Sequence, residues 1–286
     1  MQTLANILVD GIAYGMVLFM ITVGLALTMG LMRVVNLAHG AFAMLGGYLC
    51  TVLAGHIRFE LAVPLAVAAV ALAAVPLEMA LYRRIYRRSE LEQAIVTIGL
   101  CFVVIALANV VFGSSLRPLA FPPYLSGAVD LGIRTMPAQR LLALGSGVLV
   151  FAGLTWLIEH TDFGIKLRAT VDNAAAASAL GIDTRKIFAL AFALGAGLGA
   201  LGGIVGADLL PMTPFYPLRY MVIFLAVVAV GGLGSVKGTF AAALLLGLVE
   251  TAARYLASDY EAIVFYGVML AVLTLRPAGL FQRRTA

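Results

Sequence analysis

Apolar runs that are each long enough to cross a lipid bilayer recur along almost the whole chain. A membrane helix needs about 20 mostly apolar residues, because its backbone polar groups must all be satisfied inside the segment. Hydrophobic residues make up 63% of the 286 residues, charged residues make up 12%, and the mean hydropathy is +1.05. A soluble core cannot absorb that much apolar surface. The sequence therefore predicts an all-α integral membrane protein, a polytopic helical bundle of about eight or nine transmembrane segments.

Charges, prolines and glycine clusters bound nine candidate spans. The seventh and ninth are short. They are expected either to tilt little in a thin region or to be broken or re-entrant helices where backbone lines a cavity. The nine spans are 11–31, 36–54, 61–82, 94–112, 141–158, 187–207, 218–233, 240–257 and 262–275.

The Lys and Arg residues of the short loops set the predicted orientation. Their densest cluster, Arg83, Arg84, Arg87 and Arg88, places the loop after the third span in the cytoplasm. Alternation from there puts the N-terminus outside, the C-terminus inside, and most of the 19 cations inside, Arg33, Arg283 and Arg284 among them. The outer cations are Arg58, Arg117, Arg134, Arg140, Arg219 and Arg254.

Several function classes are excluded by the same residues. The formal charge of +5 comes from short clusters between apolar runs, which form no continuous basic face for nucleic acid. Residues 232–239 read GLGSVKGT, but Lys237 follows Val236 where a phosphate loop needs Gly-Lys-Ser/Thr. No nucleophile and base pair or metal cluster is found. We therefore expect no catalytic residue, no metal and no cofactor in this chain, and any ATP hydrolysis in a partner.

The second span carries a stripe of small and polar residues, spaced three, four or seven apart on one helix face. Polar side chains at membrane depth are costly against lipid, so the stripe should face protein or a water-filled path. Small residues also suit contacts between membrane helices, so packing and pathway lining both stay open. The stripe consists of Asn36, His39, Gly40, Ala43 and Gly47.

Glycines and a lone charge pair stand out in the later spans. Gly195, Gly199 and Gly203 repeat at intervals of four in the sixth span and predict close packing, either within the chain or against another subunit. Glu250 sits four residues before Arg254, which predicts a self-satisfied pair near the outer interface. Proton-coupled transporters usually carry more deep ionisable groups than this chain offers.

The loop at residues 159–186 is long enough for structure of its own. Its residues 167–180 read LRATVDNAAAASAL, rich in the best helix former and lacking Gly and Pro, and Gly181 follows as a C′ stop. Asp183 or Thr184 can cap the next helix. The sequence predicts a short helix at the cytoplasmic surface, whose flank of small residues at 174–177 suits insertion into another protein's groove.

This stretch resembles the cytoplasmic coupling loop of permeases of ATP-binding cassette importers, whose pattern is Glu-Ala-Ala, three residues, then Gly. Ala175, Ala176 and Ala177 precede Gly181 at that spacing, although the Glu itself is absent. The run RATVDNAAAASALGID, together with NLAHGAFAMLGGY at residues 36–48, resembles the smaller membrane subunit of branched-chain amino acid importers and their urea-transporting relatives. The similarity covers essentially the whole chain.

The resemblance implies a type II importer-like permease with one transmembrane domain, residues 1–286, in which residues 159–186 form the coupling loop. Implied partners are ATP-binding cassette subunits that use ATP and Mg, a second homologous permease in a heterodimer or homodimer, and a periplasmic binding protein. The substrate would be a branched-chain amino acid or small amide, and the location the bacterial inner membrane. The alternative is a secondary, ion-coupled transporter of a small polar solute. The implied coupling residues are Arg168, Asp172, Asn173, Ala175, Ala176, Ala177 and Gly181.

Overall fold

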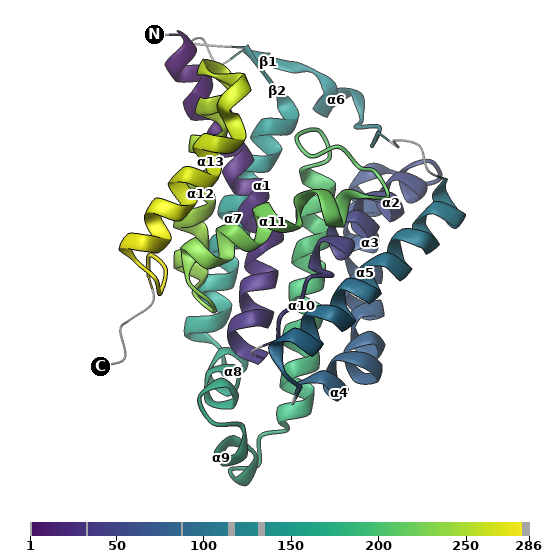
Figure 1. Ribbon diagram of the computed structural model, residues 1–286. Coiled ribbons are helices and arrows are strands. Elements are labelled where there is room, and N and C mark those ends of the chain that lie inside the picture. Colours follow the sequence, from purple (N-terminus) through teal and green to yellow (C-terminus); the bar gives the residue numbers. More distant parts are fainter. Residues whose placement is uncertain (1, 33, 87, 114–117, 131–134, 282–286) are drawn as a thin grey trace.

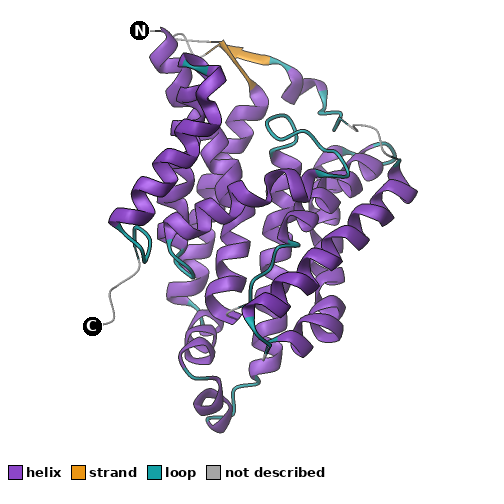
Figure 2. Cartoon of the chain, in the orientation of Figure 1, coloured by secondary structure: helices purple, strands orange, loops and turns teal. Residues whose placement is uncertain are grey.

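The computed structural model of the chain describes residues 2–32, 34–86, 88–113, 118–130 and 135–281. These residues are almost entirely helical, with two short strands near the N-terminal end (Figures 1 and 2). Seven helices are long and apolar enough to cross a membrane, which confirms the polytopic helical fold. Six of the cations used for the orientation lie outside the described residues: Arg33, Arg87, Arg117, Arg134, Arg283 and Arg284.

Every predicted span corresponds to a helix. The long helices are α1 Gln2–Met32, α3 Phe59–Leu77, α5 Glu90–Phe112, α7 Ala138–His160, α10 Thr184–Val205 and α12 Val236–Leu256. The third span continues from α3 through the π-helix η1 Glu78–Tyr82 into α4 Arg83–Ile85, and the ninth joins η2 Ser258–Tyr260 to α13 Glu261–Leu275. Two helices of 16 residues complete the set, α2 His39–Ala54 and α11 Tyr216–Gly231.

The lengths of three spans can be compared with the prediction that only the seventh and ninth spans are short. The seventh span is short as predicted, since α11 has 16 residues. The ninth is not, because η2 and α13 together run 18 residues from Ser258 to Leu275. The second span was expected to begin at residue 36, but residues 34–38 are not helical and α2 begins at His39. The second span is therefore a further short helix that the apolar pattern did not distinguish from a full-length one.

Helix α1 forms the centre of the bundle and packs against α7, α10, α11 and α12. Glycines let these helices approach closely: a Cβ on Gly24 would lie 2.2 Å from the Gly195 carbonyl oxygen of α10. The other α10 glycines behave alike, because Gly199 faces His39 and Gly203 faces the Ala43 backbone of α2. The glycine pattern of the sixth span therefore serves packing within the chain.

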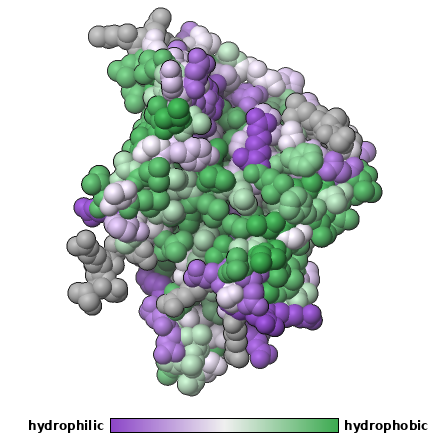
Figure 3. Space-filling view, viewed as in Figure 1, coloured by the Kyte–Doolittle hydropathy of each residue, from purple (hydrophilic) through white to green (hydrophobic). Residues whose placement is uncertain are grey.

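In the outer helices α3, α5, α7 and α13 only a minority of the side chains is buried inside the chain. Figure 3 shows apolar side chains over the middle of one face and hydrophilic ones gathered toward its lower end. This apolar belt fits contact with lipid tails or with other membrane subunits.

The two ends of the bundle differ in structure. At the N-terminal end lie α6 Pro123–Ser126 and the antiparallel strands β1 Ala128–Asp130 and β2 Thr135–Pro137 (Figure 1). At the opposite end lie α4, α8 Asp162–Asp172 and α9 Ala174–Ala179. The arginine-rich turn after the third span and the loop predicted to be its cytoplasmic neighbour therefore share one end of the molecule.

Candidate functional site

Helix α2 is preceded by a largely buried, non-helical segment, residues 34–38, inside the bundle. The Val35 N–H donates to Gln93 Oε1 at 3.0 Å, and the Leu37 N–H donates to Thr97 Oγ1 at 3.2 Å. Gln93 and Thr97 of α5 are themselves buried. Unpaired backbone groups are costly away from water, so these two side chains replace the hydrogen bonds that a continuous helix would have made. They allow the break before α2.

The N-terminus of α11 meets that of α2 close to the middle of the bundle (Figure 1). His39 Nε2 lies 3.0 Å from the Ile21 carbonyl oxygen of α1, and a Cβ on Gly40 would lie 3.1 Å from Pro217 Cα. Ile21 is about 16 Å along the helix from Met32, and half the hydrocarbon thickness is about 15 Å. The two helix N-termini, each with a partial positive charge, therefore meet near mid-depth. Transporters often build substrate sites at such discontinuous helices.

All the residues of the predicted stripe are buried in this region. The small residues make close contacts inside the chain: Gly40 with Pro217, Ala43 with Gly203, and Gly47 with Met212. The stripe thus serves helix packing, one of its two predicted roles.

Its two polar members keep unused hydrogen-bonding capacity. Asn36 and His39 are each 1% exposed. Asn36 Oδ1 accepts a hydrogen bond from the Tyr82 hydroxyl at 2.7 Å. Asn36 Nδ2 and His39 Nδ1 have no partner among the described residues. Pathway lining stays a prediction, which rests on these two atoms. Tyr82, Gln93 and Thr97 were not predicted as site residues, although polar residues inside apolar spans were a signal that could have found them.

The loop at the opposite end contains two helices where one was predicted. The helix expected over residues 167–180 is split at Asn173, whose φ of −155° and ψ of 97° leave the helical region. Asn173 Oδ1 then caps α9 by accepting from the Ala176 N–H at 3.0 Å. Asparagine side chains compete for backbone hydrogen bonds, and here that competition ends α8 and starts α9.

The end of α9 follows the prediction. Gly181 has a φ of +85°, its N–H donates to the Ser178 carbonyl, and the Ile182 N–H donates to the Ala177 carbonyl. This pair of bonds is the Schellman arrangement that closes a helix with a glycine. Asp183 caps α10 by accepting from the Lys186 N–H at 3.2 Å, and this hydrogen bond holds the pKa of Asp183 below its usual value. The loop is thus a defined structure between two caps.

The exposed side of the loop differs from the predicted flank at one residue. Arg168, Asp172, Asn173, Ala175, Ala176 and Gly181 are exposed. Ala177 is 2% exposed and faces inward, whereas Leu180, which was not predicted, is 82% exposed. A surface that could dock a partner is therefore formed by the three alanines at 174–176 with Leu180.

Contacts with the spans hold this loop against the bundle. Arg83 Nη2 donates to the Arg185 carbonyl at 3.4 Å, and Arg83 Nε lies 2.9 Å from Glu78 Oε2. Lys237 Nζ, in the first turn of α12, lies 2.8 Å from Glu159 Oε1 at the end of α7. A force on the loop would therefore reach α3, α7, α10 and α12 directly.

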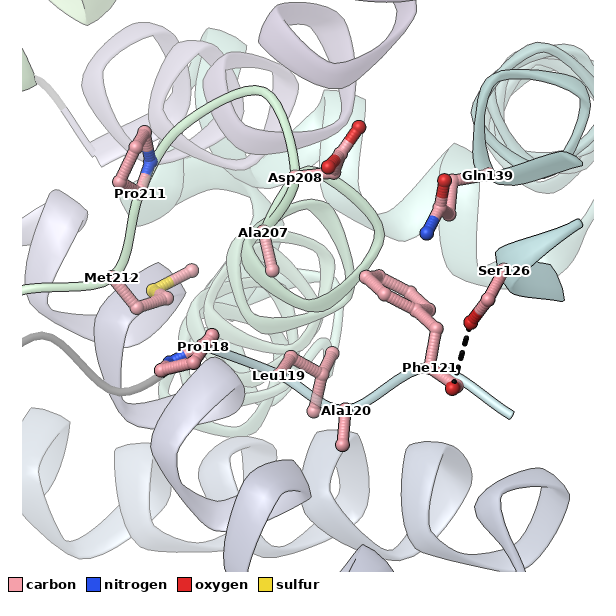
Figure 4. Close-up of a pocket in the computed structure, with 10 residues that line it drawn as sticks. All are labelled: Pro118, Leu119, Ala120, Phe121, Ser126, Gln139, Ala207, Asp208, Pro211 and Met212. Atoms are coloured by element: carbon pink, nitrogen blue, oxygen red, sulfur yellow. Dashed lines mark hydrogen bonds between the residues drawn. The ribbon is translucent and has the colours of Figure 1, made fainter. Parts of the chain in front are cut away.

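The N-terminal end of the bundle holds a pocket of about 370 Å³. Figure 4 shows Asp208, Gln139 and Ser126 on the Phe121 side of this pocket and Met212 on the other side. The Ser126 hydroxyl donates to the Phe121 carbonyl at 2.9 Å. Met212 also packs on Gly47 of α2, so the pocket ends against the short helix that begins at mid-depth.

Long apolar spans, two short helices that meet at mid-depth and a structured loop at one end define a multi-pass membrane transport protein. The chain matches the family described as "Branched-chain amino acid transport system / permease component" over residues 7–273, and it belongs to this family.

Its relatives match along nearly their full length. The high-affinity branched-chain amino acid transport system permease protein LivH of Escherichia coli K12 is 25% identical, over 96% of this chain and 94% of LivH. The corresponding protein BraD of Pseudomonas aeruginosa is 27% identical over 96% and 95%. The probable LivH of Methanocaldococcus jannaschii is 26% identical over 96% and 91%. No solved structure matches this chain.

The family match confirms the predicted class. Its members are membrane permease subunits of ATP-binding cassette importers, so this chain is a transporter subunit and not an enzyme. The helix breaks alone would fit an ion-coupled transporter as well, since such transporters also bind substrate at discontinuous helices. The family match decides in favour of the ATP-binding cassette importer over the ion-coupled transporter.

Proposed function

We propose that this chain forms half of the translocation pathway for branched-chain amino acids or closely related small amides. A second permease, homologous or identical, would form the other half. The observation that carries the proposal is the family match over residues 7–273. The mid-depth meeting of α2 and α11 supports it, because an interrupted helix pair gives a polar solute backbone and side-chain partners inside an apolar bundle.

The whole chain would act as one permease domain in the bacterial inner membrane, with residues 159–186 as the coupling loop. The cytoplasmic face would be the end that carries α4, α8 and α9, with the C-terminus on the same side. The described cations Arg83, Arg84, Lys166, Arg168 and Arg185 support this orientation, because Lys and Arg are enriched in short cytoplasmic loops.

ATP and Mg would be bound by separate subunits that dock on the coupling loop. The alanines at 174–176 permit close backbone approach, and the Leu180 side chain, 82% exposed, would fill an apolar pocket of the ATPase. The caps at Asn173 and Gly181 hold α9 in shape before docking, which lowers the entropy cost of binding.

Substrate would arrive at the opposite end from a periplasmic binding protein. The pocket beside Asp208 and Gln139 (Figure 4) lies there and ends on Met212 against α2. The permease itself can bind its solute weakly, since the binding protein supplies specificity.

Reconstitution tests this function. The chain would be assembled in proteoliposomes with the partner permease, ATPases and binding protein of its own operon, and uptake of labelled L-leucine measured. We expect uptake only with ATP on the ATPase side, and no ATP hydrolysis by the purified chain alone. Uptake by this chain alone under a proton or sodium gradient would contradict the proposal.

A further inference from the structure

A second pocket, of about 320 Å³, lies where the outer ends of α12 and α13 meet α11. Its volume is at the lower end of the range of small-molecule sites, about 300–1,000 Å³. The walls combine carboxylates with an apolar surface. They include Ile223, Glu250, Asp259, Glu261, Ala262 and Phe265.

Glu250 is the buried polar group of this pocket. It is 6% exposed, and its Oε1 accepts from the Tyr14 hydroxyl at 3.0 Å and from Arg254 Nη2 at 3.1 Å. The predicted pair with Arg254 is therefore present. Glu250 Oε2, however, has no partner among the described residues. A buried carboxylate oxygen without a donor is costly, so the arrangement calls for a donor from outside the chain.

The charges around the pocket leave an excess of carboxylates. Arg254 is shared, because its Nη2 also lies 2.8 Å from Glu261 Oε1. Asp259 adds a third carboxylate on η2 and makes no ion pair with the described cations. Three carboxylates around one guanidinium attract a cationic group to this pocket.

An unpaired cation lies one helical turn away. Arg219 comes four residues before Ile223, so both lie on the same face of α11. Arg219 is exposed, pairs with no carboxylate of the described chain, and has its guanidinium carbon 5.4 Å from the centre of the Tyr220 ring. Arg219 was expected among the outer cations, but it lies in the first turn of α11, whose N-terminus is near mid-depth. An exposed arginine there is costly against lipid, so this face borders water or another subunit.

We propose that this pocket binds a zwitterionic amino acid with an aliphatic side chain. Its α-ammonium group would donate to Glu250 Oε2, and its side chain would pack on Ile223 and Phe265. Its carboxylate would face Arg219, whose planar guanidinium suits bidentate pairing. The inference rests on the proposed function and deepens it, because a site of this kind selects amino acids over uncharged amides.

Binding to the assembled importer without ATP or binding protein tests this site. The probe would be labelled L-leucine, with 3-methylbutylamine, which lacks the carboxylate, and 4-methylpentanoate, which lacks the ammonium group, as competitors. We expect the amine to compete and the acid to compete roughly tenfold more weakly or worse.

Substitutions test the contacts to the ammonium group and to the carboxylate group of the ligand separately. Glu250→Gln and Asp259→Asn should weaken leucine binding roughly tenfold, whereas Glu90→Gln, at the exposed start of α5, should not. Asp259 is exposed, so its variant carries the test if Glu250→Gln misfolds. Arg219→Gln should weaken binding of leucine but not of the amine.

Failure of this inference differs from failure of the proposed function. ATP-driven leucine uptake with variant affinities equal to those of the Glu90→Gln control would overturn the site and leave the function standing. If the wild type shows no ATP-driven leucine uptake, the proposed function is wrong. The site is then still tested by comparing the binding of the amine to the wild type with its binding to the Asp259→Asn variant. If Asp259→Asn separates the two permeases while leucine fails to bind the wild type, the pocket holds a partner's cation and the inference is wrong.

Discussion

Gly203 shows at the scale of one residue why this bundle needs its glycines. A Cβ at this position would lie 2.1 Å from the Ala43 carbonyl oxygen, and real Cβ atoms do not approach backbone so closely. The contact joins α10 to the first turns of α2, so it helps fix where the short helix begins. The sequence predicted that these glycines pack, but their partners on α1 and α2 follow from the tertiary arrangement alone.

Replacing Gly203 with leucine should therefore destabilise the permease. Overpacking of this kind costs about 1–3 kcal/mol, and the backbone on the other side cannot yield without moving α2. The matched control is Gly99→Leu in α5, since a Cβ there would meet nothing within 4 Å. Thermal unfolding of the two variants in the same detergent measures the difference. Equal melting temperatures would show that α2 and α10 are not packed in this way.

At the scale of elements, the sequence predicted the spans well because apolar runs and their charged boundaries are local. It failed at the start of α2, since residues 34–38 are as apolar as a helix. Gln93 and Thr97 bind the backbone of this non-helical segment, and they lie 58 and 60 residues from the backbone groups that they bind. It failed again at Asn173, where a local signal was present in the side chain that caps α9. Four residues of the candidate stripe lie in α2, but Asn36 precedes the helix and so does not share its face. The burial of the stripe could not be predicted without α10 and α11.

The exposed surface of α9 carries the prediction for the coupling loop. Leu180→Asp should release the ATPase and abolish uptake while leaving the permease folded, because Leu180 is 82% exposed and packs little within the chain. Leu233→Asp, an exposed leucine in the turn between α11 and α12, is the control and should keep the ATPase bound. Copurification of the ATPase with each variant gives the readout. Retention of the ATPase by Leu180→Asp at wild-type levels would make the loop a simple connector.

At the scale of the molecule, the candidate sites lie along one axis. The pocket beside Asp208 lies at one end, the meeting of α2 and α11 near the middle, and the coupling loop at the other end. Arg83 links that loop to Glu78 in the π-helix, and Tyr82 of the same π-helix holds Asn36 before α2. This chain of contacts gives motion of the loop a physical route to the helix break. Irregular helix turns of the π type often occur at such functional positions.

Each of these roles depends on which end of the axis is cytoplasmic. Moving arginines across the membrane is expensive, so the end that carries Arg83, Arg84 and Arg168 should stay inside. Single cysteines would be introduced in a background lacking Cys50 and Cys101 and tested in intact cells with a membrane-impermeant thiol reagent. Ser126→Cys and Ser258→Cys, which are exposed near the N-terminal end of the bundle and at the outer turn between α12 and α13, should be labelled. Ser178→Cys on α9 should react only after the membrane is permeabilised, and its labelling in intact cells would place the coupling loop where no ATPase can reach it.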